Sequence, residues 1–490
     1  MGMLAAMPPT PDALATPSVG PDRGRADACP GALRLHPAED GHLARLRLPG
    51  GYLTHRQLLA IADAADALGD GEIEITSRGN AQLRGLTEQC AADLAERLRA
   101  VGLLPSDTHE RVRNIVASPL AGLDGRGAAS AELPRWVSEL DAALCAAPWA
   151  ARLSGKFLFA LDDGRGDIAT LDADVTLIAV GDGRALLRLG RARRATLVDD
   201  PVPAALDAAR RFLELAAGRA WHLREVQDEL PEGETLLPRF TGERPLLGAV
   251  GGAVAVGGGV AVGGAVPVGG AVAVDGAVSV GGAVPVGGGV SVGLRFGRAS
   301  SAQWRLLADA LGPGDGGESV RLTPWRGVVV PGAGVEWLPR LADAGFRVES
   351  GGPWEGVTAC TGLPGCGKAL ADVRAQAARA IAAVPVAGLP VHWSGCERRC
   401  GHPAGRWVDV LATGTGHRVT VDGRTRETGP ASPNESTENG GTGRTGRTEH
   451  GRTGRTERDR TENDPTEHDP TEYETAEAVA EARNAEWRRT

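Results

Sequence analysis

The feature that most constrains the fold is a sequence pattern that occurs twice, in residues 42–86 and again in residues 292–330. Each copy begins with a short alternation of apolar and polar residues, which predicts a strand. The apolar positions of these two predicted strands are Leu46 and Leu48, and Leu294 and Phe296.

Each copy continues with the signals of a helix. Gln57 follows Thr54 by three residues, and Gln303 follows Ser300 in the same way. This is the capping box, which satisfies two backbone groups at a helix start. Apolar residues then recur at helical spacing. They are Leu58, Ile61, Ala65 and Leu68 in the first copy, and Leu306, Leu307, Ala310 and Leu311 in the second.

Each copy ends with a glycine and a second predicted strand. Gly69 and Gly312 lie where a helix C-terminus favours a left-handed residue. The strands predicted after them cover residues 72–76 and 319–323. A strand–helix–strand unit that occurs twice predicts an internally duplicated α+β protein.

Two segments of low complexity interrupt this pattern. Residues 251–292 repeat a Gly/Ala/Val hexad, which favours a flexible linker over a parallel β-helix because glycine leaves little side chain to bury. Residues 424–490 repeat short polar units and are predicted to be a disordered tail, although residues 472–489 could form a helix. The predicted organisation is a disordered leader (1–28), a first half-domain (29–105), an α+β domain (106–247), a linker (248–293), a second half-domain (294–350), a further α+β domain (351–423) and the tail (424–490).

Composition limits the partners and the compartment. The 490 residues carry a net charge of −9, and no run of Lys or Arg stands apart from acidic residues, so no nucleic-acid partner is expected. No membrane span is expected either, because glycine breaks the longest apolar stretch. Residues 1–20 lack an export signal, so a cytoplasmic location is expected. In that compartment metal binding is favoured over disulfides for clustered cysteines.

Four of the seven cysteines form two pairs. Cys360 and Cys366 are separated by five residues, and Cys396 and Cys400 by three. Both pairs lie in Gly/Pro-rich loops, and a helix predicted over residues 368–381 would place its N-terminus beside them. This arrangement favours an iron–sulfur cluster. A structural zinc site is the alternative, although zinc-binding pairs usually enclose two to four residues.

At these cysteines the chain resembles the sulfite/nitrite reductase superfamily, whose motif is a pair spaced by five and then a Ser-Gly-Cys-x-x-x-Cys loop. Ser394, Gly395, Cys396 and Cys400 match that loop. The resemblance covers residues 29–423 and implies ferredoxin-like half-domains, reductase-type α+β domains and a 4Fe–4S cluster on the four cysteines. In siroheme members the last cysteine bridges the cluster and the siroheme iron, which implies that role for Cys400.

The resemblance also implies a basic cleft for the carboxylates of a tetrapyrrole, which arginine can pair bidentately. The segments ITSRGNAQLRG, RVRNIVASPLAG and LSGKFLFALDD match the anion-binding positions of the family. The implied substrate-binding residues are Arg78, Gln82, Arg84, Arg113, Asn114 and Lys156. Leu158 stands where the reductases have a second lysine, which argues against sulfite reduction.

Three segments, residues 28–53, 156–169 and 360–374, are most similar to the precorrin-3B synthase branch of the superfamily. That branch implies O2-dependent hydroxylation of precorrin-3A with γ-lactone formation, in aerobic cobalamin biosynthesis. Its partners would be the tetrapyrrole, dioxygen and an external electron donor, with a further iron, siroheme or non-haem, beside the cluster. The alternatives are a siroheme-dependent nitrite or sulfite reductase and a non-catalytic metal-binding interaction protein. No catalytic residue is assigned.

Overall fold

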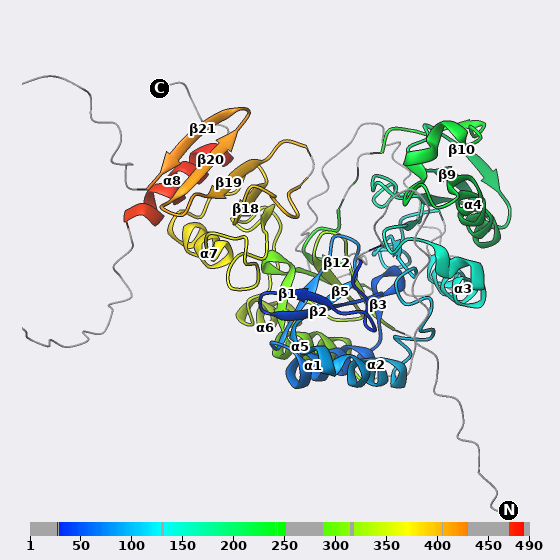
Figure 1. Cartoon of the computed structure of the whole chain (residues 1–490), viewed down its shortest axis with the longest axis horizontal. Coiled ribbons are helices and arrows are strands. Elements are labelled where there is room, and N and C mark those ends of the chain that lie inside the picture. The colour runs from blue at the N-terminus through cyan, green and yellow to red at the C-terminus, as the bar shows by residue number, and fades with distance from the viewer. Residues whose placement is uncertain are drawn as a thin grey trace, which may run out of the picture. The chain divides into compact units, whose positions relative to one another are not determined.

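The chain divides into two compact units, residues 1–350 and 351–490, which are described separately (Figure 1). This computed structural model describes residues 27, 29–128, 132–240, 242, 244–250, 288–313, 318–403, 405–429 and 470–484. The predictions for most of the leader, for hexads 251–287 and for tail residues 430–469 fall outside these ranges. No helix in the described ranges has both the length and the apolar character that crossing a membrane requires.

Two sheets of the first unit have the same topology, with strand orders β1-β2-β5-β4-β14 and β12-β13-β16-β15-β3. The strands of the first sheet are His36–Ala38 (β1), Gly41–Leu46 (β2), Glu72–Ile75 (β4), Ala81–Leu86 (β5) and Arg298–Ser300 (β14). Those of the second are Gly248–Val250 (β12), Gly289–Gly293 (β13), Val320–Leu322 (β15), Gly327–Pro331 (β16) and Tyr52–Leu53 (β3). The predicted duplication is therefore present in the backbone.

Each copy lends its shortest strand to the sheet of the other copy. Strand β3 of the first copy pairs with β15, where Tyr52 lies opposite Arg321. Strand β14 of the second copy pairs with β4, where Arg298 lies opposite Glu74. Because each sheet is completed by the other copy, the two copies form one module rather than two independent domains.

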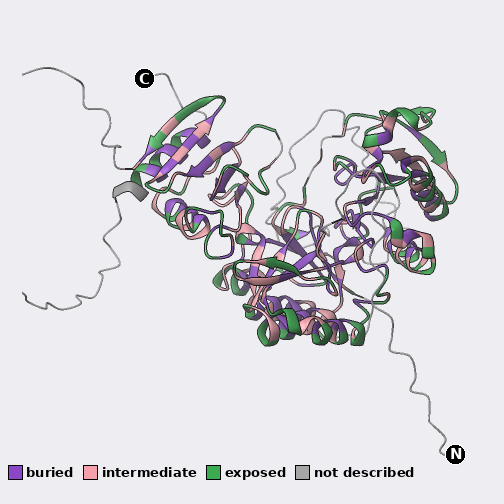
Figure 2. Cartoon of the chain, viewed as in Figure 1, coloured by how far each residue is buried: buried purple, intermediate pink, exposed green. Residues whose placement is uncertain are grey.

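Helices cover one face of this module. Helices His55–Leu68 (α1) and Ser301–Leu311 (α5) pack against each other, and Ala91–Ala100 (α2) packs beside α1 (Figure 1). Trp337–Asp343 (α6) follows in the second copy. In Figure 2 these helices are largely exposed on the side away from the strands and buried on the side that faces them. The apolar spacing read from the sequence therefore places the core correctly on α1, where Leu58, Ile61 and Ala65 are buried.

Both predicted capping boxes are confirmed: the Thr54 and Ser300 hydroxyls accept from the backbone N–H of Gln57 and Gln303, and both Gln side chains bond back. Gly312 ends α5 in the predicted left-handed region, with a φ of 82°. The prediction for Gly69 is wrong, because its φ is −122°. Gly69 instead allows the backbone of Arg84 to pass close to the end of α1, since a Cβ at position 69 would lie 2.6 Å from the carbonyl oxygen of Arg84.

The predicted linker is wrong at both ends. Strand β12 pairs with β13, and β13 is formed by the end of the hexad repeat. Val290 and Val292 on β13 are fully buried, and because they alternate with Gly289, Ser291 and Gly293 they share one face of the strand. Leu294–Phe296, predicted to be a strand, instead lead into a tight turn in which Phe296 has a φ of 55°.

A mixed sheet lies between the two copies in the sequence, with strand order β11-β10-β9-β8-β7-β6. Its strands are Ile115–Ala117 (β6), Phe159–Asp162 (β7), Val175–Gly181 (β8), Arg184–Leu189 (β9), Arg194–Val198 (β10) and Thr235–Leu236 (β11). Strands β6, β7 and β8 run parallel, so their carboxyl ends lie at one edge. Helices Leu133–Ala146 (α3) and Pro201–Ala216 (α4) pack on this sheet with a core that includes Trp136, Phe157 and Phe212.

The second unit is a sheet ordered β17-β18-β19-β20-β21 with two helices. The strands are Val357–Ala359, Val391–Ser394, Val408–Ala412, His417–Val421 and Arg424–Thr428, and the helices are Val373–Ala383 (α7) and Pro470–Arg483 (α8). Strand β21 lies in the tail predicted to be disordered, so that prediction is wrong there, whereas α8 lies where the sequence allowed a helix over residues 472–489. The Arg483 guanidinium anchors α8 by donating to the carbonyls of Leu389, Pro353 and Glu355.

Candidate functional site

The four predicted cluster cysteines lie in two loops at one edge of the second unit's sheet. Strands β17 and β18 are parallel, so the loops that follow them leave the sheet on the same side. Cys360 directly follows β17, and Cys396 follows β18 after Gly395. The sheet therefore brings together two cysteine pairs that are thirty residues apart in the sequence.

Backbone contacts hold the two cysteine loops against each other. The Gly395 N–H donates to the Cys360 sulfur at 3.2 Å, and the Leu370 N–H donates to the Gly395 carbonyl at 2.8 Å. Position 395 has to be glycine for this approach, because a Cβ there would lie 2.6 Å from the Cβ of Ala369. An N–H group aimed at a thiolate is the contact that iron–sulfur sites use.

The four thiols lie near one another but are not drawn together as tightly as a single zinc ion would hold them. Burial raises the pKa of Cys400, and the proximity of Cys396, Cys360 and Cys366 raises it further, so all four sulfurs are within electrostatic reach. Four sulfurs around one zinc ion would be about 3.8 Å apart. Among the described residues, the cysteines do not form a group of three with ligand atoms within 4.8 Å of one another.

The helix predicted beside the first cysteine pair begins later than expected. Helix α7 starts at Val373, where the Asp372 side chain accepts from the N–H of Ala375, and Lys368 lies in the turns before it. Leu370 is exposed rather than buried on a helix face. The helix therefore begins five residues later than predicted, and its first turn still contacts the cysteine loop, because the Arg374 side chain donates to the Cys360 carbonyl.

A second set of predicted residues gathers in the first unit, held by a chain of buried amides. The Asn80 side chain accepts from the N–H of Leu48 and donates to the Asn114 side chain, which in turn donates to the carbonyl of Phe157. These bonds join four segments that are distant in sequence. Three of them carry a basic residue of this group: Arg47, Arg78 or Lys156.

Two arginines on the first of these segments have no acidic partner. Arg47 is 4% exposed and donates to the carbonyls of Arg111 and Gly155, and burial lowers its pKa to about 9. Arg45 donates to the Gln82 side chain, and its Nε is buried without a partner. Gln82, predicted to bind substrate, therefore positions Arg45.

Arg78 and Lys156 belong to the same group. Burial lowers the pKa of Arg78, and among the described residues its guanidinium has no hydrogen-bond or ion-pair partner. The nearest carboxylates, Asp174 and Asp172, are bonded to the Leu158 N–H and to Arg191. The Lys156 Nζ lies 3.7 Å from the centre of the Trp221 ring.

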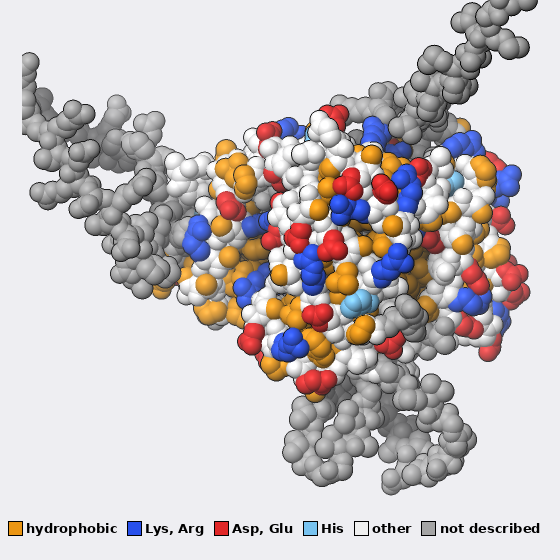
Figure 3. Space-filling model, turned by 90° about the horizontal axis from the view of Figure 1, so that it is seen from below, with side chains coloured by type: hydrophobic (Ala, Val, Ile, Leu, Met, Phe, Trp, Pro, Cys, Tyr) orange, Lys and Arg blue, Asp and Glu red, His pale blue; other side chains and the backbone are white. Residues whose placement is uncertain are grey.

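The positive charge of this group is local. The face drawn in Figure 3 mixes basic and acidic side chains, with apolar ones among them. Besides burial, Arg78 lowers the pKa of Arg45 and of Arg47, and Arg45 also lowers the pKa of Arg47, so these guanidinium groups repel each other. Cys29 lies among them, but burial raises its pKa and keeps the thiol neutral. An anionic ligand would relieve this repulsion.

Two of the predicted substrate-binding arginines already have carboxylate partners. Arg84 pairs bidentately with Asp40, and Arg113 pairs bidentately with Asp141 at 2.6 and 2.7 Å. Both guanidinium forks are occupied by the protein, so this geometry does not support a substrate contact for either. Leu158, at the family's second lysine position, is buried in an apolar cluster.

Comparison with known proteins places this geometry in a family context. Residues 36–101 match the family described as the nitrite/sulfite reductase ferredoxin-like half domain. The chain is 28% identical over 446 residues to a precorrin-3B synthase from Sinorhizobium sp, covering 85% of this chain and 86% of that protein. The chain is a homologue of precorrin-3B synthase over most of its length. Its similarity to that enzyme therefore includes both the basic group and the cysteine loops.

Similarity to nitrite reductases is partial by comparison. A ferredoxin–nitrite reductase from Synechococcus elongatus is 48% identical over 84 residues, which are 17% of this chain and 16% of that protein. The NirA protein of Mycobacterium tuberculosis has a similar structure, with a TM-score of 0.53 and 17% identity, covering 79% of this chain and 76% of that one. This likeness shows the fold alone.

In this precorrin-3B synthase homologue, sequence patterns missed part of the basic group. Arg45, Arg47 and Asn80 were not predicted to belong to it. Arg45 and Arg47 alternate with Leu46 and Leu48, so strand periodicity shows that the two arginines share a face. Periodicity does not show that this face lies beside Arg78, because the contact is made by residues far apart in sequence.

Proposed function

We propose that the chain is a precorrin-3B synthase, an oxygenase that hydroxylates precorrin-3A with dioxygen and forms the γ-lactone in aerobic cobalamin biosynthesis. The observation that carries this proposal is the group formed by Arg47, which is buried, and by Arg45 and Arg78, which are half-buried; none of the three has an acidic partner among the described residues. Charges removed from water are costly unless they are paired, so an anionic ligand would stabilise this group. A tetrapyrrole bearing several carboxylates supplies such a ligand.

The basic residues would bind and orient the substrate. The Arg78 guanidinium is free to pair bidentately with a ring carboxylate, and Lys156 offers a point charge beside Trp221. The amides of Asn80 and Asn114 keep the segments that carry these cations in fixed positions. Fixed cations cost no reorganisation when the substrate enters. We propose Arg45 and Arg47 as additional substrate-binding residues.

The cysteine loops fit a 4Fe–4S cluster on Cys360, Cys366, Cys396 and Cys400, and we propose that ligand set. A cluster held there would supply one-electron transfer from an external donor. The reaction uses two electrons and two protons for each dioxygen, with one oxygen atom entering the tetrapyrrole and the other leaving as water. We further propose that the second copy of the repeat is also a ferredoxin-like half-domain, and that both α+β domains are of the reductase type.

A siroheme-dependent reductase is the second candidate, favoured by the half-domain match at residues 36–101. The two candidates differ in what they do with a tetrapyrrole: the reductase retains it as a cofactor, and the synthase releases it as a product. Buried Leu158 favours the synthase, because the reductases have a lysine at that position.

Two measurements test the proposal. Protein purified without added tetrapyrrole is extracted and its pigments are identified, and purified protein is then supplied with precorrin-3A, reductant and 18O2. We expect no siroheme, and a lactone product that carries one 18O atom. Stoichiometric siroheme together with nitrite reduction would instead establish the reductase.

A further inference from the structure

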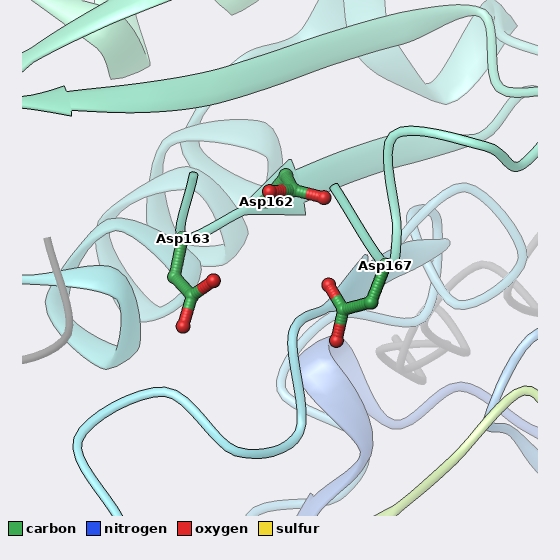
Figure 4. A group of neighbouring side chains, drawn as sticks. All are labelled: Asp162, Asp163 and Asp167. Atoms are coloured by element: carbon green, nitrogen blue, oxygen red, sulfur yellow. The ribbon is translucent and has the colours of Figure 1, made fainter. Parts of the chain in front are cut away.

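Three buried carboxylates gather at the carboxyl ends of β6 and β7. Asp162 ends β7, Asp163 follows it directly, Asp167 lies in the same loop, and none is more than 1% exposed (Figure 4). One oxygen of each lies within 4.8 Å of the others. In sheets with parallel strands this edge is the usual place for a ligand.

The hydrogen bonds of these carboxylates leave one oxygen open. Asp162 accepts four backbone N–H bonds, from Gly164, Gly166, Ile168 and Ala169, so its acceptor positions are full. On Asp167 the Oδ1 accepts from the Ser118 hydroxyl and from the Ile168 N–H. Its Oδ2 is buried without a partner.

The third carboxylate, Asp163, shares its counter-ion. Arg165 bonds to both Asp163 and Asp124, at distances between 2.7 and 3.0 Å for the ion pairs. Asp124 could therefore hold Arg165 if another cation replaced it at Asp163. Arg321, the other cation near Asp163, already donates to the carbonyls of Pro119 and Ala121.

The local charge is strongly negative. Four carboxylates lie here, those of Asp162, Asp163, Asp167 and Asp124, and Arg165 pairs with two of them, Asp163 and Asp124. Burial and the neighbouring Asp162 raise the pKa of Asp167 to about 7, so its negative charge is poorly supported by the protein alone. A buried group in this position needs either a proton or a cation.

We propose that Asp163 and Asp167 bind a divalent metal cation of the class that prefers oxygen ligands. Asp167 Oδ2 supplies the open ligand position, Asp163 supplies the second by releasing Arg165 to Asp124, and Asp162 adds charge but no ligand atom. Carboxylate oxygens are the preferred ligands of such ions, and all-carboxylate sites suit Mg2+, Mn2+ or Ca2+. The proposal uses residues distinct from the cysteine loops and the basic group.

The test uses Mn2+ as the probe and the full chain as purified. Free Mn2+ is measured by electron paramagnetic resonance during titration of the parent, of Asp167→Asn and of Asp172→Asn, a matched control because Asp172 is an exposed carboxylate paired with Arg191. We expect the parent and the control to bind one more Mn2+ than Asp167→Asn. Saturating Mn2+ should raise the melting temperature of the parent and the control but not of Asp167→Asn.

A second measurement needs no variant. Fe2+ with ascorbate and peroxide cleaves the backbone where the iron binds, and we expect cleavage of the parent near residues 162–168, suppressed by excess Mn2+. Equal Mn2+ binding by the parent and Asp167→Asn would overturn the proposal, as would cleavage confined to other parts of the chain. In that case Asp167 holds a proton rather than a metal.

Discussion

The two copies of the repeat share a backbone but use one face of their sheets differently. In the first copy Arg45, Gln82 and Glu74 lie side by side across β2, β5 and β4. The same three register positions in the second copy are Ser291, Val329 and Arg321. The first copy thus carries a polar, charged row where the second carries a largely uncharged one.

The loops that follow show the same contrast. In the first copy the Thr76 carbonyl accepts from the N–H of Gly79, and in the second copy the Thr323 carbonyl accepts from the N–H of Arg326. When the two loops are aligned on these bonds, Trp325 is the counterpart of Arg78. Trp325 packs against an apolar cluster that contains Leu158 and Val116. By the same register Gly293 corresponds to Arg47, and its backbone pairs with Arg347.

The second copy's face is covered by the protein itself. Val329 packs in a small core with Leu123 and Val250, and Arg321 holds the carbonyls of Pro119 and Ala121. In the first copy Arg45, Arg47 and Arg78 have no acidic partner among the described residues. Duplication therefore produced two equivalent faces, of which one is filled by the protein's own side chains, and we propose that the other binds the substrate.

The largest expected effect comes from removing the cation that the second copy lacks. We expect Arg78→Ala to lower kcat/KM for precorrin-3A by about a hundredfold, because a buried carboxylate of the substrate would lose its partner. Steady-state turnover under oxygen measures this loss. The visible absorption of the cluster should stay the same, since Arg78 belongs to the first unit and the cysteines to the second.

A matched control is Arg97→Ala, which removes an exposed arginine that pairs with Asp93 within α2. Exposed ion pairs of this kind contribute little to stability, so the kcat/KM of Arg97→Ala should equal that of the parent. If Arg78→Ala also behaved like the parent, the two faces would not differ in function and the comparison of the copies would fail.

The second largest effect is expected from the buried side-chain amides of Asn80 and Asn114. The second copy lacks this pair, because Gly327 stands where the first copy has Asn80. Replacing Asn114 with Ala leaves the Asn80 amide and the Phe157 carbonyl unpaired in a buried site. We expect the free energy of unfolding to fall by about 2–3 kcal/mol. Urea titration checks this value, and a change below about 0.5 kcal/mol would show that the amide chain does not hold the segments.

The local parts of this comparison could be predicted from the sequence. A capping box spans four residues, and the strand–helix–strand order follows from hydrophobic periodicity, so both were visible without a structure. The cysteine pairs were found because their spacing is itself local. The exchanged strands β3 and β14 were not predicted, because each is only two or three residues long and pairs with a partner more than two hundred residues away.

The basic residues show why motif matching alone was insufficient. Arg84 and Arg113 stand at the family's anion-binding positions, but they pair with Asp40 and Asp141, which are 44 and 28 residues away. Arg45 and Arg47 stand outside the matched motifs and have no acidic partner. Whether an arginine is free depends on acidic residues that only the folded chain brings near it.

The smallest expected effect lies where the copies are alike. The boxes of α1 and α5 have matching geometry, since the Thr54 N–H lies 3.0 Å from its Gln side chain and the Ser300 N–H 2.8 Å from its own. Thr54→Ala and Ser300→Ala should therefore each lower the free energy of unfolding by about 1 kcal/mol. Urea titrations of both variants and of the double variant measure this. If one variant left the free energy of unfolding unchanged while the other lowered it by about 1 kcal/mol, the copies would differ in their helices as well. The asymmetry between the copies could then not be assigned to the sheet face alone.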